Sequence, residues 1–325
     1  MSPRSKSTFH QFLQSLQKEN AIINPIYFHH LSDLNPKEAT AFEETWSCLS
    51  LQRRRELLEA LKKLLMEDYT LSFNAVCRIA IKDEDPQVRL LAVHTLMEYP
   101  DNDLLYTYLD MVKNDQSDVV RASVASALGH FVYLGELDEL PADTFTTVID
   151  SLLNITSGND EPMVRRRAME ALGYCERREV HDLIQSAYQS EDDEWLTSAV
   201  LAMGRSANPI WEEQVLQMLD HPIDSVRREA ARSAGELELE AARPQLLEML
   251  QDDDNTIRMI SAWSLSQICG EGVREALEEL LETCEDDKDN FSFIENALDN
   301  LAFNENLLDI PLMEFDDEDD IFDTD

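Results

Sequence analysis

The sequence predicts an all-helical protein built as an α-solenoid, a stack of repeated helix pairs. The chain has 325 residues, of which 43% are hydrophobic and only 8 are glycine. That hydrophobic content is ample for a continuous core, and Leu, Ala, Glu and Arg dominate the long segments, which favours helices over strands. The strongest evidence is an internal repeat, because self-similarity at a fixed spacing is the signature of stacked supersecondary units.

A short frame recurs along the chain, with Val or Ile followed by Arg and then by small and apolar residues at helical spacing. Its copies are DPQVRLLAVHTL (85–96), SDVVRASVASALG (117–129), EPMVRRRAMEALG (161–173), DSVRREAARSAG (224–235) and DNTIRMISAWSL (254–265). DEWLTSAVLAMG (193–204) is a degenerate copy in which Leu196 replaces the arginine. Positions 165, 196, 227 and 258 are 31 residues apart, so the repeat length is regular in this half of the chain.

The interval between Arg121 and Arg165 is longer, at 44 residues. We expect the surplus to form a longer connection at GELDELPADTFTT (135–147), which contains Pro141. Second amphipathic segments such as DLLYTYLDMVK (103–113) and IWEEQVLQML (210–219) lie between the copies, so each repeat is predicted to be a pair of antiparallel helices. The turns between the helices are rich in acids and proline, which suit the N-terminus of the following helix.

Further helix pairs are predicted at both ends, at 38–68 and at 273–303, which gives about eight pairs in all. We therefore divide the chain into an N-terminal helix and cap (1–36), an N-terminal helix pair (37–70), one continuous solenoid (71–303) and an acidic tail (304–325).

The repeated frame over residues 71–303 resembles the HEAT-repeat family, particularly the short bacterial repeats related to phycobilisome lyases. The resemblance implies a right-handed superhelix in which the frame helix is the second of each pair and lines the concave surface. It is specific for the fold and nearly silent on function, because HEAT proteins share a scaffold and differ in what they bind.

The recurring arginines are predicted to be structural. Taking 100° per residue, Val164, Ala168 and Leu172 form a buried stripe, and the arginine lies on its flank. There its stem can pack while its guanidinium reaches a carboxylate in a turn. The set is Arg89, Arg121, Arg165, Arg227 and Arg258, and Leu196 should interrupt any ladder of ion pairs at the fourth copy.

Other side chains on the frame helix should face the groove, if the HEAT arrangement holds. Positions one, two, five and nine after the arginine then include Leu91, Ala122, Glu170 and Glu229, among others. The residues predicted to bind a partner are Arg166, Arg167, Tyr174, Arg205, Arg228, Arg232, Met259 and Trp263. The alternative is that the arginines only form a solvated helix face with pairs such as Arg166 and Glu170, and both readings stay open.

Catalytic, cofactor and metal sites are not expected from the sequence. The chain has no His-Glu dipeptide of the kind that binds iron in HEAT-like deoxyhypusine hydroxylases, no zinc-ligand spacing, no phosphate loop and no GxSxG motif. Its 66 acidic and 27 basic residues give a net charge of −39, which disfavours broad nucleic-acid binding. Five scattered cysteines, no secretory signal and no membrane span indicate a cytoplasmic protein.

The function predicted from the sequence is therefore a non-catalytic scaffold or adaptor that binds a protein or peptide along its concave face. The alternative is an enzyme or nucleic-acid-processing protein that uses a basic mid-groove, similar to a bilin lyase or a DNA glycosylase. The tail carries ten acids and no base, with apolar residues such as Leu312 and Phe315. We expect it to compete for the groove around Arg166, Arg167, Arg228 and Arg232.

Overall fold

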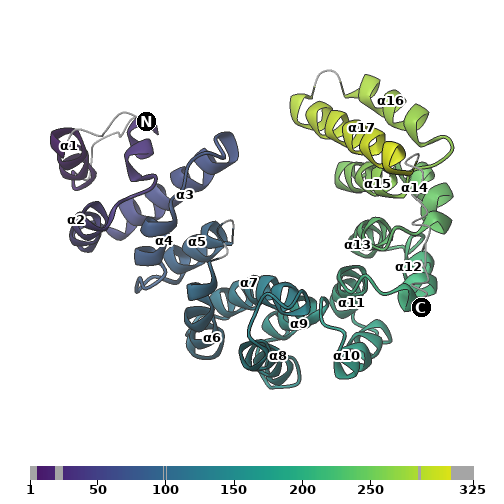
Figure 1. Cartoon of the computed structure of the whole chain (residues 1–325), viewed down its shortest axis with the longest axis horizontal. Helices are drawn as coiled ribbons and strands as arrows, with labels where there is room; N and C mark the ends of the chain where they lie inside the picture. The colour runs from purple at the N-terminus through teal and green to yellow at the C-terminus, as the bar shows by residue number, and fades with distance from the viewer. Residues whose placement is uncertain (1–5, 19–24, 98, 100, 285–286, 309–325) are drawn as a thin grey trace, which may run out of the picture. The chain divides into compact units, whose positions relative to one another are not determined.

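The computed structural model describes residues 6–18, 25–97, 99, 101–284 and 287–308 (Figure 1). These residues form seventeen α-helices and four short 3-10 helices, without a strand among them. The prediction of an all-helical α-solenoid is confirmed, and the helices after α1 follow one another as eight successive pairs, from α2–α3 to α16–α17.

The helices have the following bounds: α1 Lys6–Leu16, α2 Pro36–Ser47, α3 Leu51–Glu67, α4 Asn74–Ala80, α5 Pro86–Leu96, α6 Leu105–Asn114, α7 Asp118–Glu136, α8 Ala142–Thr156, α9 Pro162–Leu172, α10 Arg178–Tyr188, α11 Asp193–Arg205, α12 Glu212–Met218, α13 Asp224–Glu236, α14 Arg243–Met249, α15 Asn255–Ile268, α16 Val273–Thr283 and α17 Lys288–Leu308. The 3-10 helices are η1 Pro25–Leu31, η2 Asn102–Leu104, η3 Pro209–Trp211 and η4 Glu240–Ala242.

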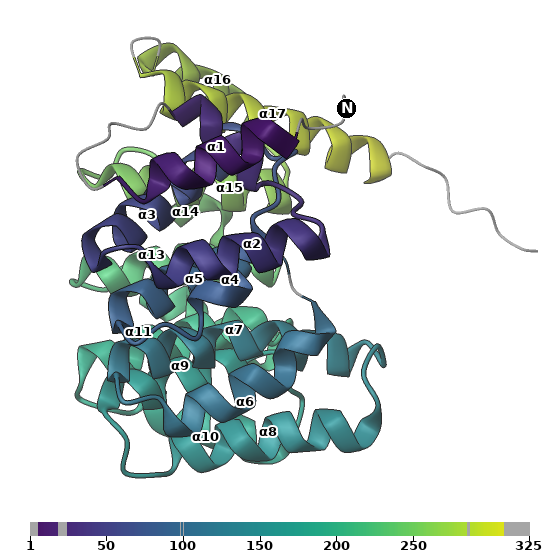
Figure 2. The same cartoon turned by 90° about the vertical axis from the view of Figure 1, so that its left-hand side faces the viewer.

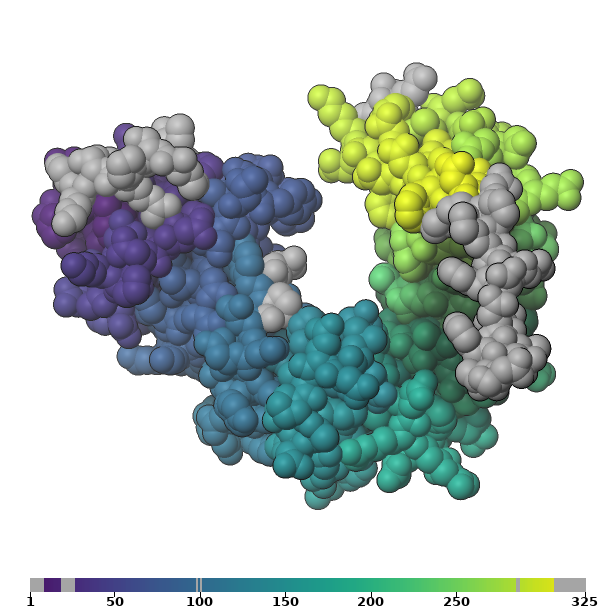
Figure 3. Space-filling model, in the orientation of Figure 1, coloured from purple at the N-terminus to yellow at the C-terminus, as the bar shows by residue number. Residues whose placement is uncertain are grey.

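The chain divides into two compact units, Met1–Ser186 and Ala187–Asp325, which we call the N-terminal and C-terminal units. In the N-terminal unit the second helices of the pairs, α3, α5, α7 and α9, pack successively against one another (Figure 1). In the C-terminal unit α11, α13, α15 and α17 do the same. We call each of these series a second-helix row. The helices run across each stack (Figure 2), and side chains fill the space between neighbouring ribbons of a unit (Figure 3).

The turns begin the second helices as the sequence predicts. Asp85, Asp192 and Asp254 each accept hydrogen bonds from backbone N–H groups in the first turn of the helix that follows. Pro86 and Pro162 occupy the first helical position, where proline lacks an N–H that would have no helical partner anyway. Acidic turn residues thus cap α5, α11 and α15, whereas α7, α9 and α13 begin without a side-chain cap.

The buried stripe is also confirmed. Val164, Ala168 and Leu172 are each 0% exposed, and the same frame positions in α13, Val226, Ala230 and Ala234, are buried to the same extent. Small side chains at these positions let second helices approach one another closely.

The long interval before Arg165 does not form a longer connection, so this expectation is wrong. Its surplus residues lengthen α7 to 19 residues and α8 to 15, and only residues 137–141 separate the two helices. The reason is that apolar periodicity continues past the frame, since Phe131 and Val132 are fully buried in the extended part of α7.

The C-terminal boundary also differs from the sequence prediction. Helix α17 continues to Leu308, beyond the expected start of the tail at residue 304, whereas residues 309–325 lie outside the described residues. The division into an N-terminal cap, a helix pair and one continuous solenoid over residues 71–303 stays a prediction.

Candidate functional site

Three of the five recurring arginines join their turn to the next one, as the sequence predicts: Arg89, Arg121 and Arg227. Arg165 and Arg258 donate to backbone carbonyl groups of their own turns. Arg89 forms a two-pronged ion pair with Asp115, with its Nε and Nη2 at 2.8 and 2.7 Å from the carboxylate oxygens. Its Nη1 also donates to the backbone oxygens of Asp83 and Glu84 in its own turn, both at 2.9 Å. Such planar, two-pronged pairs fix orientation as well as adding attraction.

The pattern repeats in both units. Arg121 pairs with Asp160 at 2.9 and 2.6 Å, and in the C-terminal unit Arg227 contacts Asp252 at 3.0 Å. We call these contacts between turns the rungs. Burial is substantial, because the Arg89 side chain is 14% exposed and that of Asp115 is 4% exposed. Leu196, which occupies the arginine position of α11, is buried.

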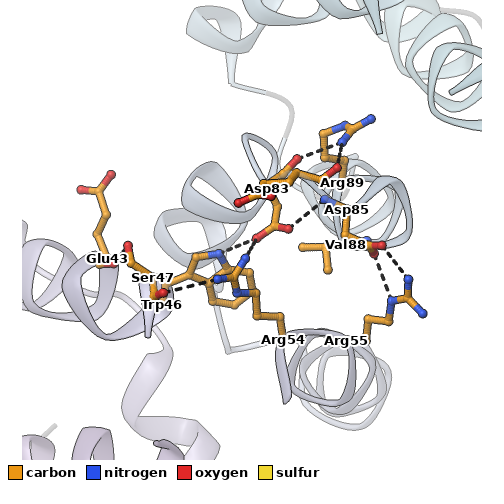
Figure 4. A network of polar contacts seen from close by, with 10 residues as sticks. Glu43, Trp46, Ser47, Arg54, Arg55, Asp83, Asp85, Val88 and Arg89 are labelled. Atoms are coloured by element: carbon orange, nitrogen blue, oxygen red, sulfur yellow. Dashed lines mark hydrogen bonds and ion pairs between the residues drawn. The ribbon is translucent and has the colours of Figure 1, made fainter. Parts of the chain in front are cut away.

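A further rung lies before the first one that the sequence reveals (Figure 4). Arg54 of α3 donates to Asp83 at 2.9 Å, and the indole N–H of Trp46 donates to the same carboxylate oxygen at 2.9 Å. Arg55 makes a separate two-pronged pair with Asp85, which holds the pKa of that carboxyl below its usual value. Three consecutive arginines in α3 make it unclear from the sequence which one occupies the arginine position of the frame. The frame has buried residues three and seven positions after its arginine, and Leu57 and Leu61 fulfil this for Arg54.

Close helix approach adds a second kind of contact in the C-terminal unit. Ser233 Oγ donates to the carbonyl of Val200 at 2.8 Å, and Ser264 Oγ donates to that of Ala231 at 2.7 Å. The glycine of the frame makes room for these serines, since a Cβ built on Gly235 would lie 2.7 Å from Ser264 Oγ. Neighbouring second helices of this unit are therefore joined by hydrogen bonds from serine hydroxyls to backbone carbonyls.

Partly exposed cations lie on the surface of this row. Arg228 and Arg232 share the carboxylate of Glu229, with Nε–Oε distances of 3.5 and 3.2 Å. The arginine side chains are 34% and 41% exposed, whereas that of Glu229 is only 13% exposed. The outward side of this cluster is therefore cationic.

Arg205 at the end of α11 belongs to the same neighbourhood. Both Arg205 and Arg232 act electrostatically on Glu236, yet burial raises the pKa of this carboxyl above its ordinary value. The buried Oε2 of Glu236 has no hydrogen-bond partner in the described part of the chain. Trp263 of α15, which is half-buried, occupies the same frame position as Arg232 in the adjacent helix. We call Arg205, Arg228, Arg232 and Trp263 the arginine surface.

The remaining predicted residues do not all face outward. Met259 is 7% exposed, so it offers little surface to a partner, because α15 packs against both α13 and the long α17. The expected exposure of Leu91 and Ala122 is also wrong, since they are 8% and 4% exposed. A frame derived from one helix carries no information on how far its neighbours extend over it.

In the N-terminal unit the predicted groove residues lie on α9 and just after it. Arg167 is exposed and pairs with Glu170 at 2.5 Å, whereas Glu170 is 3% exposed and does not point into solvent as expected. Arg166 is half-buried. Tyr174 packs edge-on against Tyr133 with the ring centroids 5.6 Å apart. Arg166, Arg167 and Tyr174 thus belong to one unit, and the arginine surface belongs to the other.

Most of the cysteine thiols are buried. Cys77, Cys175, Cys269 and Cys284 are buried and Cys48 is exposed, all as free thiols. Burial raises the pKa of Cys77 and of Cys175 to about 12, so neither is a thiolate near neutral pH. The part of the chain that the structure describes contains no group of three His, Cys, Asp or Glu side chains suited to a metal ion.

None of the helices in the described ranges is long and apolar enough to cross a membrane.

Comparison with known proteins identifies the class. A family model of HEAT repeats matches residues 50–129 and 212–295, about half of the chain. The chain therefore belongs to the HEAT-repeat family, as the sequence frame indicated. No curated protein matches its sequence.

Several solved structures are similar in fold. The complex of CpcE and CpcF of phycocyanin lyase from Nostoc sp. PCC7120 is 17% identical, with 70% of this chain and 94% of that one covered and a TM-score of 0.47. Yeast importin-β (Kap95p) is 12% identical over 91% of this chain and 46% of its own, with a TM-score of 0.47. Human deoxyhypusine hydroxylase is 17% identical over 91% and 96%, with a TM-score of 0.38.

Proposed function

We propose that this protein is a non-catalytic HEAT-repeat scaffold that binds a protein or peptide partner on its second-helix rows. The arginine surface is the observation that carries the proposal. Arginine and tryptophan are the residues most enriched where partners bind tightly, because they combine apolar area with fixed hydrogen-bond geometry.

The contacts within the rows support a binding role for the residues left outside. The rungs occupy Arg89, Arg121 and Arg227, and the serine contacts join neighbouring helices of the C-terminal row. Arg228 and Arg232 take no part in either kind of contact, and both pair with Glu229. A face built from side chains that the fold does not need for packing suits recognition.

The partner can be sought by affinity purification with the full chain as bait, in a matched pair of variants. Arg228→Glu with Arg232→Glu reverses two exposed charges on the arginine surface. Lys288→Glu with Lys113→Glu makes the same change in net charge at two exposed lysines that are not part of this surface. We expect at least one protein to be captured by the wild type and by the lysine control, to be lost with the arginine variant, and to bind directly once purified.

Binding that is insensitive to the arginine variant would contradict the proposed site. Nucleic acid is the second candidate ligand, because the arginine surface is locally cationic. Titration with labelled single-stranded DNA at increasing salt distinguishes the two, since phosphate contacts release counterions and lose affinity steeply with salt. Tight, salt-sensitive DNA binding that is lost in the arginine variant would replace the scaffold proposal with the nucleic-acid alternative.

A further inference from the structure

Helix α17 ends on the same side of the C-terminal unit as the arginine surface. Near the start of α15 and α17, Asn255 and Asn290 exchange side-chain hydrogen bonds at 3.2 Å. Near their ends, Asn300 and Asn304 donate to Ser266 Oγ and to its carbonyl, both at 3.0 Å. The two helices therefore run in the same direction, and the chain leaves α17 beside the end of α15.

The next helices of the row have the same direction and register. Near their starts, α11 contacts α13 through Thr197 and Ser225, and α13 reaches the turn before α15 through Arg227 and Asp252. Farther along, the serine contacts join α11 to α13 and α13 to α15 at equivalent positions of the frame. The C-terminal ends of all four helices therefore lie at one end of the unit. Arg205 is the last residue of α11, and Arg232 lies one turn before the end of α13.

The segment that follows α17 has the chemistry to bind there. Residues 309–325 contain nine acidic side chains and no basic one, together with large apolar residues such as Leu312 and Phe315. With a helix spacing of about 8–10 Å, two to three spacings separate α17 from α13 and α11, or about 16–30 Å. An extended chain of this length reaches about 55 Å, so the arginine surface is well within its span.

We propose that residues 309–325 dock in cis on the arginine surface of the C-terminal unit, with carboxylates on Arg205, Arg228 and Arg232 and an apolar residue against Trp263. The proposal rests on the proposed function, because it describes how the same surface is regulated. A partner must then displace the chain's own acidic segment before it binds.

Net charge favours the tethered segment over an acidic segment of another protein. The whole chain carries −39, which repels a free acidic partner as it approaches. A tethered segment is already present at an effective concentration of about 1 mM when its linker spans the gap. Each exposed ion pair contributes little by itself, so tethering is what makes the occupancy significant.

Photo-crosslinking in the full chain tests the docking directly. Benzoylphenylalanine replaces Phe315, the protein is irradiated at low and at high salt, and crosslinked peptides of the monomer are mapped by mass spectrometry. We expect crosslinks on α13 and α15 that weaken at high salt because charges are screened. Arg228→Glu with Arg232→Glu should abolish them, and the lysine control defined above should retain them.

Crosslinks that fall elsewhere, or that the arginine variant leaves unchanged, would overturn the proposal. Crosslinks found only between two copies would overturn docking in cis as well. None of these outcomes bears on partner capture. The proposed function is tested separately, with a full chain in which the nine acids of residues 309–325 are changed to Asn or Gln. If docking is correct, this variant captures more partner than the wild type, whereas failure of both to capture any partner contradicts the proposed function alone.

Discussion

The two units join their successive repeats by different contacts, although they share one sequence frame. In the N-terminal unit the strongest contacts are two-pronged rungs between turns, such as Arg89 with Asp115. In the C-terminal unit the rung from Arg227 is single, and serine hydrogen bonds and frame glycines bring the helices together along their C-terminal halves. The second helices of neighbouring repeats are therefore joined by ion pairs near their starts and by close helix contacts toward their ends. The two units differ in which kind of contact is stronger.

The largest expected loss of stability comes from substitution of the buried frame alanine, and it should be similar in both units. Ala168 and Ala230 occupy the same frame position and are both fully buried. Ala168→Arg and Ala230→Arg each force a charge and excess volume into a tight contact, so each should cost at least about 4 kcal/mol of unfolding free energy. Urea denaturation measures the loss. Asn154→Arg, at an exposed position of α8, is the control and should be nearly neutral.

Removal of a rung should affect the N-terminal unit more. Arg89→Ala leaves the nearly buried Asp115 without its partner and should cost about 2–3 kcal/mol, less than a fully buried pair. Arg227→Ala should cost less, because its contact with Asp252 is single. Arg177→Ala, which removes an exposed pair with Asp150, should cost less than about 1 kcal/mol. Equal losses for Arg89 and Arg227 would abolish the contrast between the units.

Substitution of a frame glycine should destabilise the C-terminal unit more than the N-terminal unit, the opposite of what we expect for removal of a rung. A Cβ on Gly235 would meet the backbone of Ser264 at 2.8 Å, which forces the helices apart, whereas a Cβ on Gly129 would lie 3.3 Å from the nearest atom of Ala171. We expect Gly235→Ala to cost about 1–2 kcal/mol and Gly129→Ala to be nearly neutral, because alanine also gains about 1 kcal/mol in helix propensity. Thermal melting of both variants checks this order.

The smallest expected effect is on the pH dependence of stability. Ionisation of one carboxyl stabilises the N-terminal unit, and ionisation of another destabilises the C-terminal unit. The pKa of Asp160 is lowered by Arg121, so this pair contributes stability above the ordinary carboxyl pKa and loses it as the pH falls through the lowered value. The pKa of Glu236 is raised by burial, so ionisation of Glu236 costs stability as the pH rises through the raised value. Arg205 and Arg232 reduce this cost and Glu229 adds to it.

Glu236→Gln should therefore increase stability slightly at neutral pH and remove this decline with rising pH. Asp160→Asn should instead decrease stability at neutral pH. Urea denaturation of both variants between about pH 5 and pH 8 separates the two signs. A loss of stability for Glu236→Gln across this range would show that its ion pairs outweigh its burial.

Prediction from the sequence succeeded where the repeat constrains every copy alike. The buried stripe at Val164, Ala168 and Leu172 and the rungs from Arg89 and Arg121 followed from period and spacing alone. It failed where a neighbour decides the outcome. Glu170 is covered beneath Arg167, and whether Met259 is exposed depends on the helices beside α15. The residues of the candidate site lie in both units, and their arrangement in one groove stays a prediction.

The rungs bear on how such a chain can grow or shrink by recombination. A repeat that carries a rung supplies one guanidinium to the turn after it, and that turn supplies the carboxylate, as Arg89 and Asp115 illustrate. Duplication or deletion of a whole repeat preserves this correspondence, whereas a break within a repeat leaves a donor or an acceptor buried without its partner, at a cost of about 1–3 kcal/mol. Gene rearrangements that keep whole repeats are therefore the ones that leave the rungs intact, as between Arg89 and Asp115 or between Arg121 and Asp160.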